Sequence, residues 1–215
     1  AGGENQCAGP GRRALMRPFL LGVAGGTASG KTTLAALAAR ALGAGVLTHD
    51  RYYLDAPNPH GHDFDRPEAL ESSLLAGHLV RLRRGEAIEA PVYDFATHRR
   101  ADRTERIEPA KILLIEGILV LSEPAIAEQL DLAIYVECAD DVRLARRLRR
   151  DTTERGRDWE GVLDQWFATV RPAHMKYLPR SRQRADLCLN GEGDIHGECQ
   201  RLVHAVLAAL TARGE

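Results

Sequence analysis

The sequence lacks most features that mark secreted, membrane or nucleic-acid-binding proteins. Its four cysteines have no paired short spacing, which argues against a zinc knuckle or a dense disulfide framework and predicts a cytoplasmic protein. No apolar run approaches the roughly 18 residues of a transmembrane helix. A formal net charge of −1 gives no electrostatic case for nucleic-acid or membrane-surface binding. Lysine is also scarce, because only Lys31, Lys111 and Lys176 occur among the 29 basic residues.

The length and composition predict one folded domain. The chain has 215 residues, of which 44% are hydrophobic, which is ordinary for a globular protein with a sizeable core. Residues 1–15 contain Gly, Pro and Arg but no apolar stretch typical of a secretory signal. We therefore expect a flexible leader over residues 1–15, a natural start at Met16 and a single domain over 16–215.

Short apolar runs alternate with helical periodicity along this domain. The pattern predicts strands at 18–24, 45–48, 111–115, 132–136 and 185–189, and helices at 32–42, 67–84, 141–150, 159–170 and 195–211. Such alternation is typical of an α/β fold with a parallel sheet covered on both faces. The polar, Pro-bounded stretch 87–109 fits this pattern poorly, and we expect it to form an appended β-hairpin lobe.

A phosphate-binding loop follows the first predicted strand. Residues 25–32 match the pattern G-x4-G-K-[ST], in which backbone N–H groups and a helix N-terminus surround phosphate oxygens. In this pattern Lys31 reaches the terminal phosphates and the Thr32 hydroxyl binds Mg²⁺. The nucleotide-binding residues predicted here are Gly25, Gly26, Thr27, Ala28, Ser29, Gly30, Lys31, Thr32 and Thr33.

Two acidic residues that follow strands limit the reactions that this phosphate-binding loop could support. The chain has no Asn-Lys-x-Asp run, which a GTPase would use to bind guanine. Glu116 ends the predicted strand 111–115, where a carboxylate can hold Mg²⁺. Asp50 follows the second strand and is expected in the same crevice, because ligands lie beyond the carboxyl ends of parallel strands. A carboxylate there can accept the proton of a hydroxyl that attacks a phosphate, and it can also contact the metal.

Arginines are concentrated between positions 143 and 157, where seven occur in 15 residues. Arg143, Arg146, Arg147 and Arg150 share one quadrant of the predicted helix. This quadrant lacks i,i+4 glutamate partners, so we expect the arginines to face a polyanion rather than acidic side chains. Guanidinium groups bind phosphoryl oxygens bidentately and remain charged.

Six motifs occur along the chain in an order that resembles the uridine kinase (uridine–cytidine kinase) family. They are the GVAGGTASGKTT segment, Asp50-x-Tyr-Tyr, Phe64-Asp65-x-Pro, PVYDFATH at 91–98, EGIL at 116–119 and ERGRD at 154–158. The resemblance extends from about residue 19 to residue 189. It implies a P-loop NTPase fold with a β-hairpin substrate lobe and an Arg-rich lid at about 150–158. The implied reaction is transfer of phosphate from ATP or GTP, with Mg²⁺, to the 5′-hydroxyl of uridine or cytidine.

The resemblance also implies individual roles. Asp50 falls where the family keeps its general base, and Lys31 and Arg150 complete the predicted catalytic set. Mg²⁺ is expected between Thr32, Glu116 and Asp50, while Arg155 and Arg157 of the lid bind the triphosphate. The nucleoside-binding residues implied are Phe64, Asp65, Tyr93, Phe95, His98, Arg147 and Gln165. Relatives in this family are tetramers, which implies a homotetramer here.

Alternative interpretations remain open at this point. The chain could be a phosphoribulokinase-like or pantothenate-kinase-like enzyme, or a nucleotide sensor without catalytic activity. The loop between Asp50 and Asp65 is several residues shorter than is usual in the family, so its path near the sugar is not predicted. His60, His62 and Asp63 in this loop could bind a metal, but we see no fourth ligand.

Overall fold

A five-stranded parallel sheet forms the centre of the molecule. The structure is a computed structural model that describes residues 17–56 and 62–214, so the expected leader, Met16 and His60 lie outside the described residues. The strands are β1 (Phe19–Gly25), β2 (Gly45–Thr48), β5 (Ile112–Glu116), β6 (Leu132–Glu137) and β7 (Leu187–Asn190), in the order β2-β5-β1-β6-β7. Every residue of β1 and β5 is buried, as the near-continuous apolar runs predict. The predicted α/β fold with a parallel core sheet is confirmed.

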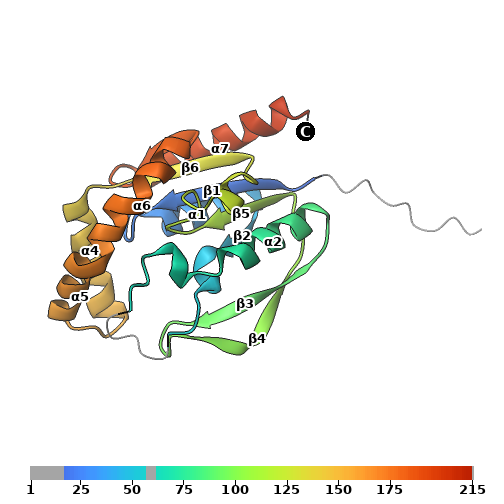
Figure 1. Cartoon of the computed structure of the whole chain (residues 1–215). Coiled ribbons are helices and arrows are strands. Elements are labelled where there is room, and N and C mark those ends of the chain that lie inside the picture. The colour runs from blue at the N-terminus through green and yellow to red at the C-terminus, as the bar shows by residue number, and fades with distance from the viewer. Residues whose placement is uncertain (1–16, 57–61, 215) are drawn as a thin grey trace, which may run out of the picture.

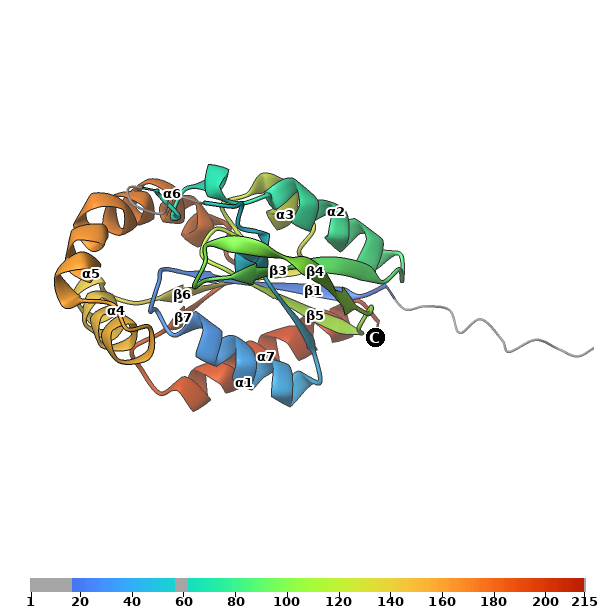
Figure 2. The same cartoon turned by 90° about the horizontal axis from the view of Figure 1, so that it is seen from below.

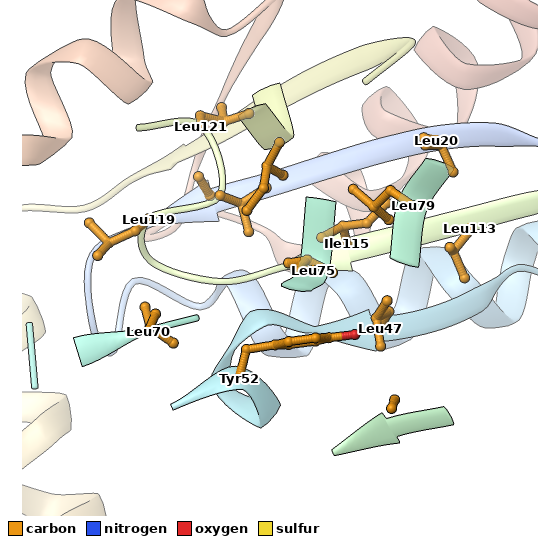
Figure 3. Packing of buried hydrophobic residues seen from close by; sticks show 14 of the residues in the cluster. Leu20, Leu47, Tyr52, Leu70, Leu75, Leu79, Leu113, Ile115, Leu119 and Leu121 are labelled. Carbon is orange, nitrogen blue, oxygen red and sulfur yellow. The ribbon is translucent and has the colours of Figure 1, made fainter. Parts of the chain in front are cut away.

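Helices cover both faces of this sheet. Figure 2 shows α1 (Lys31–Leu42) and α7 (Ile195–Ala212) on one face, and α2 (Ser72–Arg83), α3 (Pro124–Ala127) and α6 (Arg171–Arg184) on the other. Alternate residues of β1 enter different cores: Leu21 packs with the α1 and α7 side, whereas Leu20 packs with the α2 side. Figure 3 shows the second of these cores, in which Leu75 and Leu79 of α2 lie over Leu113 and Ile115 of β5.

The expected hairpin lobe is a separate two-stranded sheet. Strands β3 (Ile88–Asp94) and β4 (Arg99–Ile107) pair antiparallel, with a register shift between Pro91 and Tyr93. Figure 1 shows this hairpin below α2, apart from the central sheet. The turn between its strands contains His98, whose φ of 53° lies in the left-handed region. Tyr93 at the end of β3 is buried in the core on the α2 side, whereas Phe95 in the turn is exposed.

The helix predicted at 67–84 is interrupted. Residues Pro67–Ala69 form one 3-10 turn, Leu70 is extended with φ −119° and ψ 139°, and α2 begins only at Ser72. Leu70 forms an isolated bridge to Tyr53, which holds it in the extended conformation. The leucine periodicity crosses this break, because Leu70 and Leu75 enter the same core from different backbone conformations.

The arginine-rich helix and the region after it also differ from the prediction. Helix α4 (Asp140–Glu154) continues four residues beyond the predicted end at 150, into the segment expected to form the lid. The predicted helix 159–170 is α5 (Trp159–Gln165) followed by a π-helical segment, Trp166–Val170. Helix α6 was not predicted; it contains Pro172 in its first turn and Pro179 on its exposed side. In the described part of the chain, no helix is long and apolar enough to cross a membrane.

Candidate active site

The loop after β1 has the geometry of a phosphate cradle. Gly30 has φ +94°, a conformation that a side chain disfavours, and it precedes the first residue of α1. The loop also packs closely against the end of β7, because a Cβ on Gly191 would overlap the carbonyl oxygen of Ser29. The N-terminal N–H groups of a 12-residue helix therefore point at the site beside Lys31 and Thr32.

Glu116 lies between the two polar side chains that begin α1. Its Oε1 accepts a hydrogen bond from the Thr32 hydroxyl at 3.1 Å and lies 3.3 Å from Lys31 Nζ. The carboxylate is almost completely buried, because β5 delivers it at the carboxyl end of the sheet between β1 and β2. A buried carboxylate beside a hydroxyl oxygen is a donor set that suits Mg²⁺. In residues 17–56 and 62–214 no group of three or more His, Cys, Asp and Glu residues could hold a metal, so phosphates and water would supply the other ligands.

Asp50 lies opposite this group on η1 (His49–Tyr52), a 3-10 turn that directly follows β2. Burial raises the pKa of its carboxyl to about 6, the charge of Glu116 adds to the increase, and Lys31 and Arg155 oppose it. Burial and the charge of Glu116 both favour the neutral form of the Asp50 carboxyl. A carboxylate whose pKa is close to neutrality accepts a proton more effectively than an ordinary aspartate, and it is still ionised above pH 7.

A single buried carboxylate organises the arginines of α4 and of the segment after it. Asp151 is fully buried, and its Oδ1 accepts from Arg150 Nε at 2.8 Å and lies 3.4 Å from Arg155 Nη1. Its Oδ2 lies 3.3 Å from Arg157 Nη1 and 3.7 Å from Arg147 Nε.

Three of the four arginines of this quadrant therefore have acidic partners in the structure, contrary to the expectation; that the quadrant also faces a polyanion stays a prediction. Arg143 pairs with Asp140 at 2.6 Å, and Asp151 lies at the centre of four guanidinium groups. The prediction considered only glutamates at i,i+4, whereas the partners are aspartates: Asp140 lies three residues before Arg143, and Asp151 lies four residues after Arg147. The arginine at 147 is at i−4 to one of them, and the arginine at 157 reaches it only because the chain turns back after α4.

Aromatic side chains form the opposite wall of the site. The Tyr53 ring lies 5.4 Å from Tyr93 and 5.9 Å from Phe64, and it makes a tilted and an edge contact with them. His98 stacks on Phe64 at 4.9 Å, with 28° between the ring planes. Phe95 contacts Tyr93 at 5.1 Å yet is 57% exposed, so one of its faces is free. These rings bring β3, the turn of the hairpin and the chain after η1 together around one space.

Polar groups lie between the aromatic wall and the phosphate loop. Arg147 Nη2 donates to Gln165 Oε1 at 2.7 Å, and its Nη1 donates to the Thr27 hydroxyl at 3.2 Å. Asp65 faces this guanidinium; burial raises the pKa of its carboxyl, and the charge of Arg147 opposes the increase. A carboxylate beside a fixed guanidinium provides both an acceptor and donors for a pair of hydroxyl groups.

The structure brings nearly all predicted residues into two adjoining cavities. The first, of about 360 Å³, is lined by Thr27, Lys31, Thr32, Asp50, Phe64, Asp65, Tyr93, Phe95, His98, Glu116, Arg147, Arg150, Arg155, Arg157 and Gln165. The second, of about 590 Å³, is lined by Ala28, Gly30, Thr33 and Arg146 together with Lys31, Thr32, Arg150 and Arg155 of the first. Gly26 lies nearby with Thr27 in a smaller cavity. Gly25 and Ser29 line none of these cavities and act through the shape of the loop.

Among the residues of the site that were not predicted, Tyr53 and Asp151 make the contacts that organise it. Tyr53 lines the first cavity and belongs to the recognised Asp50-x-Tyr-Tyr motif, but that motif gave its ring no role. Asp151 contacts the arginines rather than the cavity, and the sequence offers only its place among them. Tyr53 is defined by its contact with Tyr93, far away in the chain, whereas Asp151 contacts arginines within six residues of it.

The comparisons with known proteins agree with this site. A model of the phosphoribulokinase/uridine kinase family matches residues 20–194. The chain belongs to this family. It is 42% identical over 203 residues to a uridine kinase of Chloroflexus aggregans and 40% identical over 203 residues to one of Chloroflexus aurantiacus, with 91% of this chain and 97% of each relative covered.

The fold of this P-loop kinase also matches solved structures of the group. It superposes on the phosphoribulokinase of Rhodobacter spheroides with a TM-score of 0.62 and 17% identity, over 81% of this chain and 70% of that one. Family membership identifies the reaction class as phosphoryl transfer from a nucleotide. The two cavities of the kinase meet at Lys31, Thr32, Arg150 and Arg155, where donor and acceptor groups would approach each other.

Proposed function

We propose that this kinase transfers the terminal phosphoryl group of ATP or GTP to the 5′-hydroxyl of uridine or cytidine, in the presence of Mg²⁺. One observation carries the proposal: the cavity that contains Lys31, Thr32 and Asp50 is closed on its far side by an aromatic wall of the hairpin and Tyr53. Aromatic faces suit a planar base, and Asp65 with Arg147 suits the two ribose hydroxyls. The uridine kinase relatives support the same substrate.

In this proposal the side chains divide the reaction between them. Asp50 accepts the proton of the 5′-hydroxyl and orients its oxygen toward the terminal phosphate. Lys31 and Arg150 balance the negative charge of the transferred group, while Arg155 and Arg157 bind the triphosphate. Thr32 and Glu116 would hold Mg²⁺, with Asp50 beside them, and the metal would neutralise phosphate charge when bound.

The alternative substrates fit the acceptor wall less well. A sugar phosphate such as ribulose 5-phosphate requires cations to bind its own phosphate. The acceptor side of the described cavity offers aromatic rings and one guanidinium, Arg147, which is already engaged by Gln165 and Thr27. A sensor without activity would not need a general base of raised pKa beside the phosphate loop.

A panel of acceptors tests this proposal directly. Formation of ADP from Mg-ATP would be measured with uridine, cytidine, purine nucleosides, pantothenate and ribulose 5-phosphate. We expect turnover with at least one pyrimidine nucleoside and none with the last two compounds. Turnover with neither uridine nor cytidine would overturn the assignment.

We infer three further properties from the resemblance to the uridine kinase family. They are a homotetramer, a cytoplasmic location and a role in pyrimidine salvage. Sedimentation equilibrium of the purified protein tests the first, because a monomer of 23.6 kDa and its tetramer differ fourfold in mass.

A further inference from the structure

Arg100 joins the hairpin to the segment that carries the proposed base. It lies on β4, two residues after His98, and its side chain is only 24% exposed. Its guanidinium donates from Nε to the carbonyl oxygen of Tyr53 at 2.9 Å and from Nη2 to that of Tyr52 at 2.9 Å. The remaining nitrogen, Nη1, donates to Glu71 Oε2 at 2.6 Å. One side chain therefore holds three acceptors from two other parts of the chain.

The two carbonyl groups belong to the residues that follow Asp50 almost immediately. Tyr52 ends η1, the turn that holds Asp50, and its carbonyl oxygen also accepts from the Glu71 amide at 2.8 Å. In Figure 1 the cyan segment after β2 leads from this turn to the hairpin. The position of the turn relative to the sheet is thus defined partly by a residue of the base-contacting lobe.

Backbone contacts extend the same connection. The Arg100 amide donates to Asp55 Oδ1 at 2.7 Å, and the Ala56 amide donates to the carbonyl oxygen of His98 at 2.9 Å. Residues 52–56 are therefore bound on one side by the hairpin and on the other by residues 69–71, where Leu54 and Glu71 complete the hydrogen bonds. A shift of the hairpin moves this segment with it.

We propose that Arg100 is a positioning residue that couples contact of a nucleobase with the hairpin to the placement of the Asp50 carboxylate. The inference rests on the proposed nucleoside kinase function. A base bound between Tyr93, Phe95 and His98 would fix the hairpin, and the guanidinium of Arg100 would transmit that constraint to the turn that holds Asp50. Binding energy from the base would then increase kcat as well as lowering KM.

The chemistry of the contact requires arginine. A planar guanidinium can bond two neighbouring carbonyl groups and a carboxylate at once, whereas an ammonium group is a compact point charge. Arg103, three residues further along β4, is exposed and provides a matched control for the charge of the strand.

Truncation of the acceptor tests the coupling. Values of kcat would be measured for uridine and for methyl β-D-ribofuranoside, which keeps the 5′-hydroxyl but lacks the base, with the wild type, Arg100→Gln and Arg103→Gln. We expect Arg100→Gln to lower kcat on uridine at least tenfold and on the methyl riboside less than twofold. Arg103→Gln should change neither. Equal losses on both acceptors, which a merely structural role would produce, would overturn the proposal.

Hydrogen exchange provides a second measurement that needs no turnover. Uridine should slow amide exchange in the hairpin, 88–107, and in 49–56 of the wild type. In Arg100→Gln the hairpin should remain protected while the protection of 49–56 is lost; retained protection there contradicts the coupling. If uridine protects no part of the wild-type hairpin, the proposed function itself fails.

Two further variants separate a damaged fold from lost coupling. Arg100→Lys keeps the positive charge but cannot make all three bonds. Its melting temperature should therefore be closer to that of the wild type than the melting temperature of Arg100→Gln is. Its kcat on uridine should nevertheless fall toward its kcat on the methyl riboside. Glu71→Gln weakens one contact of Arg100 and leaves both carbonyl bonds, so it should reduce the difference by a smaller factor. Full wild-type kcat on uridine in Arg100→Lys would contradict the role assigned to the guanidinium.

Discussion

The donor and acceptor halves of the site are held together by different forces. On the donor side, Lys31 pairs with Glu116, and Arg150, Arg155 and Arg157 pair with Asp151, so that each of these cations has a buried carboxylate. On the acceptor side, rings pack against rings, and Phe95 is left largely exposed. Removal of a cation from the first half leaves a buried carboxylate with one partner fewer, whereas removal of a ring from the second half mainly loses contact area.

Asp50 lies where the two halves meet, and its replacement should produce the largest effect. Asp50→Asn keeps the shape of the side chain but cannot accept a proton, so we expect kcat to fall by about 10²–10⁴. The KM for ATP should change little, because the asparagine leaves Lys31 and the loop intact. Steady-state kinetics measures both values, with Asp102→Asn on the exposed side of β4 as the control. A near-normal kcat would remove Asp50 from the mechanism.

Asp151→Asn tests the donor half, which ion pairs hold together. The substitution leaves four guanidinium groups without their shared carboxylate, but three of them are partly exposed, so we expect the free energy of unfolding to fall by about 1.5–3 kcal/mol. The KM for ATP should rise as well, because Arg150 and Arg155 lose the group that orients them. Urea denaturation and kinetics measure the two effects. Asp164→Asn, an exposed acid on α5, should be neutral in both, and equal behaviour of the two variants would contradict the role of Asp151.

Acid should lower the stability of the protein through His49, the neighbour of Asp50 where the two halves meet. His49 is completely buried, its Nε2 contacts the Ser72 hydroxyl at 3.1 Å, and burial lowers its pKa to about 4. The unfolded chain takes up this proton near pH 6.5 and the folded protein only near pH 4, so stability is lost as pH falls through that window. The loss should reach about 2–3 kcal/mol at pH 4.

The matched variants for this pH dependence are His49→Gln and His204→Gln, the latter an exposed histidine of α7. Urea denaturation between pH 7 and pH 4 should show a shallower loss in His49→Gln and the wild-type loss in His204→Gln. The same slope in both variants would show that another group titrates in this range.

His98→Asn should give the smallest of these effects and tests the aromatic half. Asparagine tolerates the left-handed backbone at this position better than alanine, so the change removes the stacked ring with little backbone strain. We expect the KM for the nucleoside to rise about tenfold, which corresponds to about 1.4 kcal/mol of lost contact with the base. The KM for ATP should stay within about twofold. Equal increases for both substrates would argue against the hairpin as the base-binding lobe.

Much of the fold could be predicted because its signals are local. The buried strands are continuous apolar runs, and all five lie within a residue or two of their predicted bounds. The segment 67–84 was predicted wrongly because the extended conformation of Leu70 depends on a bridge to Tyr53, which no local pattern reveals. Helix α6 was not predicted, and it contains two prolines, Pro172 in its first turn and Pro179 in its interior, although proline usually interrupts a helix.

The sequence by itself determined the phosphate loop and the identity of the charged groups around it. The loop needs only consecutive residues, because its ligands are backbone N–H groups and the first side chains of one helix. The tertiary structure decided which charges meet: it placed Asp151 among four arginines, the Tyr53 ring against the hairpin, and Arg100 on the carbonyl groups behind Asp50. The Tyr53 and Arg100 contacts join segments that lie far apart in the chain, and only packing of the whole fold brings them within bonding distance. The arginines around Asp151 lie within six residues of it, and their meeting depends on the helix spacing and on the turn after α4. The scarcity of lysine fits the same division, since one lysine serves the loop while arginines, whose planar groups hold several acceptors, make the long-range connections.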